Sequence, residues 1–422
     1  MADCIWRGDA PAVAQVDTLT VGGTIEATDI FIMTINGKTL SVVAGSTVAA
    51  TVATTIATAW NASTIPEFAE ITAAATSGGA FTLTADTAGK PFVCTVSTTE
   101  TGGGAADAQT FGTVATTASS GPNHWDTARN WSGNAVPVNS DNVYFQNSDV
   151  SAKYGLAQSA VTVALLQIDQ SFTGEIGLPR MNEDSDEYFE YRATYLAIGA
   201  TLLTIGNGDG TGSGRIKIDV GSVACTLNVL NTGTPAESGL ESLLFKGTSA
   251  SNVATISKGS VGIAVLASET ANLTGGLTVG YQTNQAGDAA VRCGSGVTLA
   301  TITQTGGTLT TQSNVTTANK RENSGIWTLL AGTLTTLNGD GGTMFYRSTG
   351  TLTTANVGKN CRLDFSQDSR ARTVTNCNLQ AGATFFDPNE TATVTNGFVF
   401  PAGVGLKDVE LEIGEAFTLT KS

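Results

Sequence analysis

From about residue 136 onward, apolar residues stand singly or in short runs among threonines, and Gly, Asn, Asp or Ser separates each run from the next. The string Gly-Thr-Leu-Thr-Thr starts at Gly307, Gly332 and Gly350. Looser copies start at Gly199, Gly276, Gly296 and Gly382. One inward apolar residue between outward threonines, repeated about every 20–30 residues, is typical of a parallel β-helix. We therefore predict a mostly β fold in which residues 123–422 form a right-handed parallel β-helix.

A single coil of this kind cannot bury its own inward face. Coils stacked about 4.8 Å apart share that burial and pair their backbone groups. At about 20–30 residues per coil, this part of the chain makes on the order of ten coils and a rod about 50 Å long. The irregular spacing of the repeats favours a β-helix with loops of variable length. A β-propeller, which has a steadier repeat of about 40 residues, is the minor alternative.

Residues 17–100 show a different pattern, which predicts a small α+β domain. Strand-like runs occur at 17–21, 30–35, 39–43, 69–74, 81–85 and 92–97. Asn36-Gly37 is a strong signal for a tight hairpin turn between two of these strands. A helix is predicted from an N-cap at Ser46 to about Trp60, because apolar residues recur there every four positions.

Three further segments complete the predicted organisation. Residues 1–16 are expected to be an extended N-terminal arm, and residues 101–122, rich in Gly, Ala, Ser and Thr, a linker. Residues 123–145 contain Trp125 and Trp131 and are expected to cap the first coil, since an open end of a solenoid exposes its core.

Composition and charge narrow the possible partners. Charged residues make up 14% of the chain and its net charge is −15. Binding to nucleic acid needs a basic face, and the only basic pair that stands out is Lys320-Arg321, so we expect no nucleic-acid partner. We also expect no secretory signal peptide, because the first residues show no basic segment followed by an apolar one. No membrane span is expected either, because no apolar stretch reaches about 18 residues.

The six cysteines are scattered and include no Cys-x-x-Cys pair, so no zinc site is expected. Cys361 and Cys377 lie about one coil apart. They are expected to be free buried thiols, with a disulfide between stacked neighbours as the alternative.

No catalytic, cofactor-binding or metal-binding residues are predicted, and the chain is expected not to be an enzyme. The single histidine, His124, has no partner nearby in sequence and is expected to be structural. Carboxylates between residues 220 and 340 show no repeated spacing; they are Glu237, Glu241, Glu269, Asp288, Glu322 and Asp340. A denser charged group is expected to form surface ion pairs; it comprises Asp364, Asp368, Arg370 and Arg372.

Two segments are candidate partner interfaces. The first is the beginning of the arm, Cys4, Ile5, Trp6 and Arg7. The second is the acidic run Glu183, Asp184, Asp186 and Glu187. The favoured interpretation of this run is a solvated loop between coils, and the alternative is a segment that binds Ca²⁺ or a basic partner surface. The segment 207–212 partly mimics a calcium loop, but Ile218 stands where the bidentate Glu belongs, so a glycine-rich turn is predicted.

Several strings in residues 1–145 resemble a small domain of virion structural proteins of tailed bacteriophages and prophages. They are Val-Asp-Thr-Leu-Thr-Val-Gly-Gly-Thr-Ile from Val16, Ile-Met-Thr-Ile-Asn-Gly-Lys from Ile32, Ala-Glu-Ile-Thr from Ala69 and Phe-Thr-Leu-Thr-Ala-Asp-Thr-Ala-Gly-Lys-Pro-Phe from Phe81. The segment Trp-Asp-Thr-Ala-Arg-Asn-Trp-Ser from Trp125 resembles the start of β-solenoids in phage and bacterial surface proteins. The resemblance implies assembly in a bacterial cytoplasm and release in a virion, and it carries over no catalytic residue.

The expected function is therefore that of a non-enzymatic virion protein. It would decorate the capsid (cement or head-fibre type) as a homotrimer, attach to the major capsid protein or another virion protein through its N-terminal region, and display the β-helix. One alternative is a tail fibre or spike adhesin that binds cell-surface glycan. A polysaccharide-degrading enzyme and a secreted adhesin are the remaining alternatives.

Overall fold

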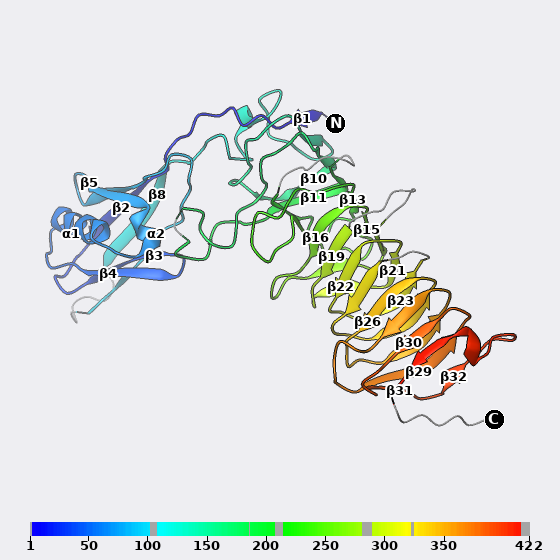
Figure 1. The fold of residues 1–422 in the computed structure, drawn as a ribbon. Helices are drawn as coiled ribbons and strands as arrows, with labels where there is room; N and C mark the ends of the chain where they lie inside the picture. The colour runs from blue at the N-terminus through cyan, green and yellow to red at the C-terminus, as the bar shows by residue number, and fades with distance from the viewer. Residues whose placement is uncertain are drawn as a thin grey trace.

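The computed structural model describes residues 2–101, 108–184, 186–206, 214–280, 289–321 and 325–414. A small N-terminal domain lies beside one end of a long rod of stacked strands, and the C-terminal end of the rod lies far from that domain (Figure 1). Within the described ranges, no helix is long and apolar enough to span a membrane.

The N-terminal domain is α+β, as predicted. One antiparallel sheet has the order β5-β6-β2-β8 and a second has the order β4-β3-β7. The strands are β2 (Val16–Gly23), β3 (Ile30–Ile35), β4 (Lys38–Val43), β5 (Ile71–Ala75), β6 (Ala80–Ala85), β7 (Thr95–Thr99) and β8 (Gln109–Thr117), and the helices are α1 (Ala49–Asn61) and α2 (Pro66–Ala69). Helix α1 starts three residues after the predicted cap. It buries Val52, Ile56 and Trp60 in the domain core, where the Trp60 Nε1 donates a hydrogen bond to the Ile71 carbonyl at 2.8 Å.

The predicted linker 101–122 is wrong for much of its length. Gln109–Thr117 forms β8, which pairs antiparallel with β2. Its threonine-rich composition was read as that of a linker, but an edge strand with one solvated face tolerates the same residues. The missing signal was tertiary, namely the free edge of β2 that β8 covers.

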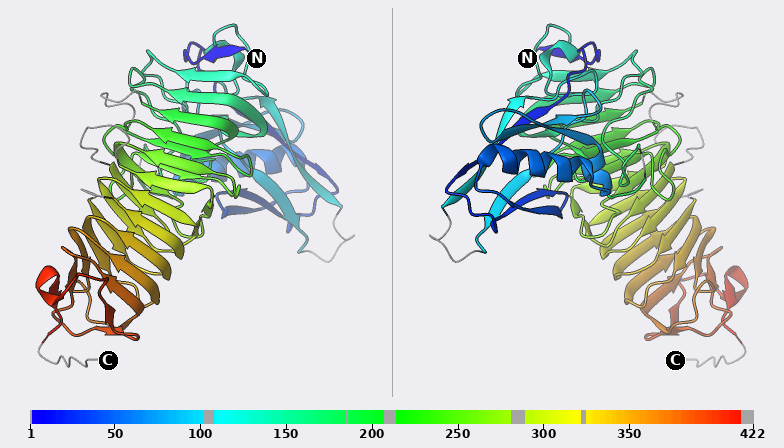
Figure 2. Two further views of the ribbon diagram at one scale, coloured as in Figure 1. Left: turned by 90° about the vertical axis from the view of Figure 1, so that its right-hand side faces the viewer. Right: turned by 90° about the vertical axis from the view of Figure 1, so that its left-hand side faces the viewer.

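The rod is a β-solenoid of parallel strands, which Figure 2 shows stacked one above another. Two parallel ladders run along most of it. The first contains β1 (Asp3–Ile5), β9 (Asn142–Phe145), β10 (Ala157–Ile168), β11 (Leu196–Ile205), β13 (Thr226–Val229), β15 (Val253–Ile256), β18 (Gly276–Val279), β21 (Thr301–Gln304), β23 (Val315–Lys320), β25 (Leu334–Gly339), β27 (Leu352–Val357), β29 (Arg372–Leu379), β31 (Ala392–Val394) and β32 (Phe398–Val399). The second contains β12 (Ile216–Asp219), β14 (Leu243–Lys246), β16 (Gly259–Ile263), β19 (Ala289–Cys293), β22 (Thr308–Thr311), β24 (Ile326–Leu329), β26 (Gly342–Tyr346), β28 (Cys361–Asp364), β30 (Thr384–Phe386) and β33 (Glu410–Glu412). The short strands β17 (Ala271–Leu273) and β20 (Val297–Leu299) form a separate pair, and two 3₁₀ turns span Ala128–Asn130 and Leu406–Asp408.

Coil length varies along the rod. The coil from Leu227 to its neighbour Ala254 spans 27 residues, whereas the coil from Ile302 to Ala318 spans 16. Of the three Gly-Thr-Leu-Thr-Thr strings, those containing Leu334 and Leu352 stack directly, and the string at Gly307 belongs to the other ladder. The repeated string therefore marks strands of one type but does not by itself give the coil length.

Inward side chains form continuous columns through the rod. One column in the first ladder is buried over its whole length and mixes larger and smaller side chains; it comprises Leu203, Leu227, Ala254, Leu277, Ile302, Ala318, Leu337, Ala355 and Cys377. Close packing of such side chains is typical of a protein interior. Lys320 is also buried in the rod, where its ammonium donates to the Gln304 side chain at 2.6 Å, and burial lowers its pKa to about 8.

The cysteines are free buried thiols. Cys361 and Cys377 do not stack, because Cys361 lies in β28 of the second ladder and Cys377 in β29 of the first. Burial raises the pKa of Cys361 to about 11 and that of Cys377 to about 12, so both stay protonated near neutral pH.

The start of the chain belongs to the rod. Strand β1 pairs in parallel with β9, and Trp6 packs against Trp131 with ring centroids 5.0 Å apart. Trp125 lies 4.6 Å from Trp131 in the same cluster, which closes the N-terminal end of the core. The predicted cap at 123–145 thus lies where expected, but it is completed by residues that we had expected to form a free arm.

The N-terminal domain is consequently an insertion between β1 and β9 and not a module at the end of a linker. The segments entering and leaving it lie together, since Val13 and Ser120 form an antiparallel bridge. His124 has a structural role at this point: its Nε2 lies 2.9 Å from the Gly89 carbonyl oxygen, which connects the cap to the inserted domain.

We expect the Trp131→Ala variant to lose about 3–5 kcal/mol of unfolding free energy, because it leaves a large cavity where the core is closed. Urea unfolding of the full chain measures this loss. The matched control is Val138→Ala, at a position that is 60% exposed in the same segment, for which a change within about 0.5 kcal/mol is expected. Equal losses for the two variants would contradict the assignment of the tryptophan cluster as the cap.

Candidate functional site at the junction of the two parts

The four candidate residues of the N-terminal arm are part of the cap. Cys4 and Trp6 are buried, Ile5 is half-buried and Arg7 is exposed. The Trp6 Nε1 donates to the Val150 carbonyl at 2.7 Å. Burial raises the pKa of Cys4, whose Sγ lies 3.8 Å from the carboxylate of Asp141. A docking surface built on the side chains of Cys4 and Trp6 is therefore wrong for this structure, because they face the interior of the chain itself.

The acidic run lies in a long loop between β10 and β11, and its Glu183 and Asp184 bind basic residues of the same chain. The Glu183 carboxylate accepts a hydrogen bond from Lys153 at 2.5 Å and also contacts Arg215. Asp184 forms an ion pair with Lys90 of the N-terminal domain. Asp186 and Glu187 are exposed. The run is thus neither a purely solvated loop nor a bare acidic patch.

The electrostatic environment of Glu183 favours its charged form. Burial raises the pKa of Glu183, but the hydrogen bonds and positive charges of Lys153 and Arg215 outweigh this effect and hold the pKa below its usual range. Glu183 therefore stays ionised at neutral pH and fastens the loop to the rod.

Glu70, between α2 and β5, is the centre of the contact between the two parts. Its Oε1 accepts hydrogen bonds from the Lys90 ammonium at 2.6 Å and the Tyr188 hydroxyl at 2.7 Å. Its Oε2 lies 3.1 Å from Nη2 of Arg192, whose Nη1 pairs with Glu190 at 3.0 Å. The side chains of Arg192 and Glu190 are 7% and 2% exposed. One carboxylate of the inserted domain thus binds two residues of the loop that leaves the rod.

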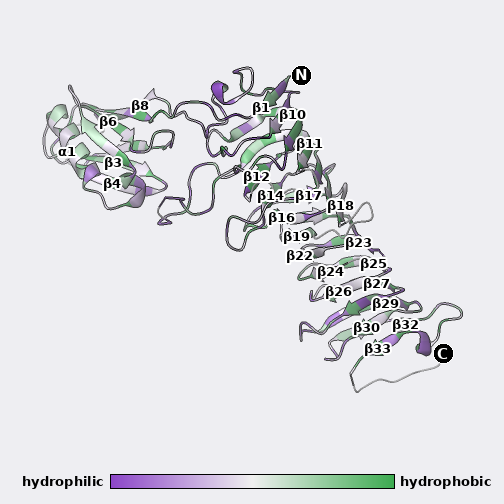
Figure 3. Cartoon of the chain, turned by 45° about the horizontal axis from the view of Figure 1, so that its top comes forward, coloured by the Kyte–Doolittle hydropathy of each residue, from purple (hydrophilic) through white to green (hydrophobic). Residues whose placement is uncertain are grey.

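Backbone contacts extend this junction. The Arg192 Nε donates to the Pro91 carbonyl at 2.6 Å, and Asn36, at the hairpin turn between β3 and β4, donates to the Phe189 carbonyl at 3.2 Å. Figure 3 shows that the loops joining the two parts carry mainly hydrophilic residues. Polar contacts with defined geometry hold the inserted domain in place, together with Tyr191 of the loop, which packs against the core of that domain. The apolar cores of the two parts form separate clusters.

Two shallow hollows lie at the junction, lined by residues that the structure describes. One, of about 270 Å³, lies between Pro91, Lys153, Tyr154 and Arg192. Another, of about 310 Å³, is lined by residues already engaged in the ion pairs, including Glu70, Lys90 and Asp184. Both hollows lie along the contact between the inserted domain and the rod, and residues of both parts line them.

The later charged group forms ion pairs, although part of it is buried and not on the surface. Asp368 pairs with Arg370 at 2.6 Å and with Arg372 at 3.0 Å, and the Arg372 side chain is fully buried. Hydrogen bonds from Arg370 hold the pKa of Asp368 far below its usual range. Asp364 is buried and pairs with Arg362 at 2.8 Å. The segment 207–212 lies outside the described residues.

A feature that sequence reasoning missed is a column of asparagines on the outer side of the first ladder. The Nδ2 of Asn338 donates to the Oδ1 of Asn319 at 3.0 Å, Asn356 donates to Asn338 at 2.9 Å, and Asn378 donates to Asn356 at 2.7 Å. A column two residues away along the strands holds Thr301, Thr317, Thr336, Thr354 and Asn376. The signal was present as Thr-Thr-x-Asn at 316–319, 335–338 and 353–356, which gives the coil length there directly.

We expect the Arg192→Ala variant to weaken the contact between the two parts by about 3–5 kcal/mol, because it breaks the ion pair with Glu70 across the junction and removes the positive charge beside the buried carboxylate of Glu190. Small-angle scattering and limited proteolysis of the full chain measure the loosened domain and the exposed connecting segments. The exposed acid Asp149, changed to Asn, serves as the control and should leave both measurements unchanged. A compact, protease-resistant Arg192→Ala variant would contradict this account.

A second prediction concerns acid. Because the folded pKa of Glu183 is lowered, its stabilising contribution is present above the unfolded pKa of about 4.3 and is lost as the pH falls toward the folded value. Proteolytic sensitivity of the 177–195 loop should therefore rise below about pH 4. Glu183→Gln should show much of this sensitivity already at pH 7, and an identical pH profile for variant and wild type would contradict the role of Glu183.

No protein-family model matches the chain, and no curated protein matches it either.

Proposed function

We propose that this chain is a non-enzymatic structural protein of a bacteriophage virion, most simply a capsid decoration or head-fibre protein that displays a β-helix. The observation that carries the proposal is the buried ion-pair network of Glu70, Arg192 and Glu190, which fixes the inserted domain to the capped end of the rod. A fixed two-part body suits attachment at one end and display of the other. The sequence resemblance of residues 1–145 to virion structural proteins supports the same assignment.

Attachment is assigned to the inserted domain in this proposal. Residues 3–6 are engaged in the cap, so the surface left for the major capsid protein or another virion protein is that of the α+β domain. We further propose that the coils are right-handed, since about 98% of parallel β-crossover connections are, and that the protein is a homotrimer.

The pairing of acidic residues weighs against a polysaccharide-degrading enzyme. Glu237 pairs with Lys217 at 2.5 Å, Glu241 with Arg292 at 2.5 Å, and Glu269 lies 3.9 Å from Lys246. Glycosidases need two carboxyl groups about 5–10 Å apart in a groove, available to the sugar. Carboxylates neutralised by lysine or arginine are poorly suited to that role.

The asparagine and threonine columns favour one second candidate, a tail fibre or spike that binds cell-surface glycan. Side-chain amides and hydroxyls in register along a flat face match the hydroxyl groups of an extended saccharide. Copy number separates the two candidates, because decoration needs many copies and a fibre only a few.

The test is to purify virions from cells that produce this chain and to quantify it against the major capsid protein by mass spectrometry. Decoration predicts a ratio on the order of one copy per capsid-protein oligomer, and a fibre predicts a handful per particle. Absence from purified particles would overturn the proposal. Light scattering of the isolated protein should give three times the chain mass of 43.0 kDa, and a monomer would exclude the trimer.

A further inference from the structure

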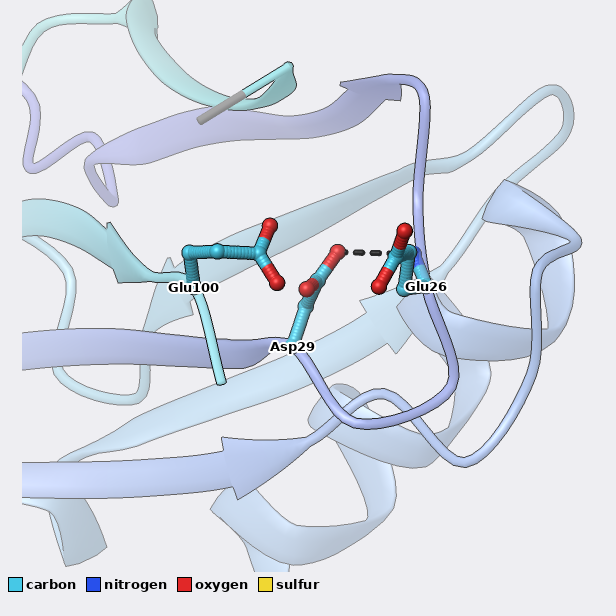
Figure 4. A group of neighbouring side chains, drawn as sticks. All are labelled: Glu26, Asp29 and Glu100. Carbon is cyan, nitrogen blue, oxygen red and sulfur yellow. Dashed lines mark hydrogen bonds between the residues drawn. The ribbon is translucent and has the colours of Figure 1, made fainter. Parts of the chain in front are cut away.

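Three carboxylates meet in the N-terminal domain, away from the junction. Glu26 and Asp29 lie in the turn between β2 and β3, and Glu100 directly follows β7. One carboxylate oxygen from each lies within 4.8 Å of the other two. Figure 4 shows the Asp29 carboxylate between those of Glu26 and Glu100.

The pairing of the backbone strands brings these three carboxylates together. Strands β3 and β7 are antiparallel with Ile30 opposite Thr99, so the register places Asp29 opposite Glu100. The turn then brings in Glu26, because the Asp29 amide donates to the Glu26 carbonyl at 3.1 Å and the Glu26 amide donates to Asp29 Oδ2 at 2.7 Å. Like charges directly opposite on paired strands repel each other and are destabilising.

Burial makes that repulsion more costly. Asp29 is 0% exposed, and Glu26 and Glu100 are half-buried. The second carboxylate oxygen of Asp29, Oδ1, is buried and has no hydrogen-bond partner within the part of the chain that the structure describes. A buried carboxylate oxygen without a donor is unfavourable unless an ion or a proton satisfies it.

We propose that Glu26, Asp29 and Glu100 form a Ca²⁺ site in which the unpartnered Oδ1 of Asp29 is a ligand. Ca²⁺ takes six to eight oxygen ligands and accepts irregular geometry, so three carboxylates and water from the half-buried side complete its shell. Mg²⁺ fits less well, since it requires a near-ideal octahedron. The bound ion joins the β2–β3 turn to the end of β7 and removes the repulsion between them.

The test is calorimetric titration of the full chain, freed of metal by chelator, with Ca²⁺ over roughly 10⁻⁷ to 10⁻³ M, the range of sensor and extracellular sites. One saturable site per chain is expected. Asp29→Asn and Glu100→Gln should each weaken binding at least tenfold, and Glu100→Gln covers the case in which the buried variant fails to fold. Asp86→Asn, an exposed acid of the same domain, should bind like the wild type.

Two outcomes would overturn the proposal. One is the absence of saturable binding by the wild type. The other is loss of binding in Asp186→Asn or Glu187→Gln with retention in Glu100→Gln, which would place the ion at the acidic run. A stability readout adds a second arm, since Ca²⁺ at 100 times its dissociation constant should shift the folding equilibrium of the domain about 100-fold. The Asp29→Asn and Glu100→Gln variants should show no such shift.

Discussion

The columns of inward apolar side chains are the constraint on which the rest of this structure depends. No coil can bury its own inward face, so each coil is stable only between two others, and the first coil has no neighbour on one side. The chain solves this at the N-terminal end with Trp6, Trp125 and Trp131 and with the short strand β1. Because β1 (residues 3–5) pairs with β9 (residues 142–145), the segment between them must leave the rod and return to the same end of it.

Most of that segment forms the N-terminal domain. Because both ends of the domain connect to the rod at one place, a polar junction is enough to fix its position. A domain attached at two points already has little freedom to turn. The contacts of Glu70 with Lys90, Tyr188 and Arg192 then remove what remains, without the large apolar interface that two independently folded domains would need. Buried ion pairs add little net stability but specify one arrangement, because any other leaves a charge buried without a partner.

The sequence predicted the class of both parts well. The hydrophobic patterns were strong in both parts. Apolar residues recur every four positions before Trp60, as in a helix, and single leucines stand among threonines in the coils, as in strands; both patterns follow from local backbone geometry. The predictions that failed, such as those of the arm and the linker, concerned segments whose structure depends on contacts distant in sequence. Nothing near Trp6 indicates that it packs on Trp131, and the ion pair of Arg192 with Glu70 spans 122 positions. The threonine-rich strand β8 resembles a linker because its partner edge on β2 lies about ninety residues away. The asparagine column is different, since Thr-Thr-x-Asn was visible and only the choice of repeat obscured it.

The pairing of β1 with β9 also sets an order on biosynthesis. During translation the first strand leaves the ribosome long before its partner exists, and the inserted domain, which has its own core, can complete its fold in the interval. The strand must therefore remain unpaired until residues 142–145 emerge, and only then can the end of the rod close. Later coils have no such delay, because each finds its template in the coil made immediately before it. The first strand of the rod is thus the one that waits longest for its partner.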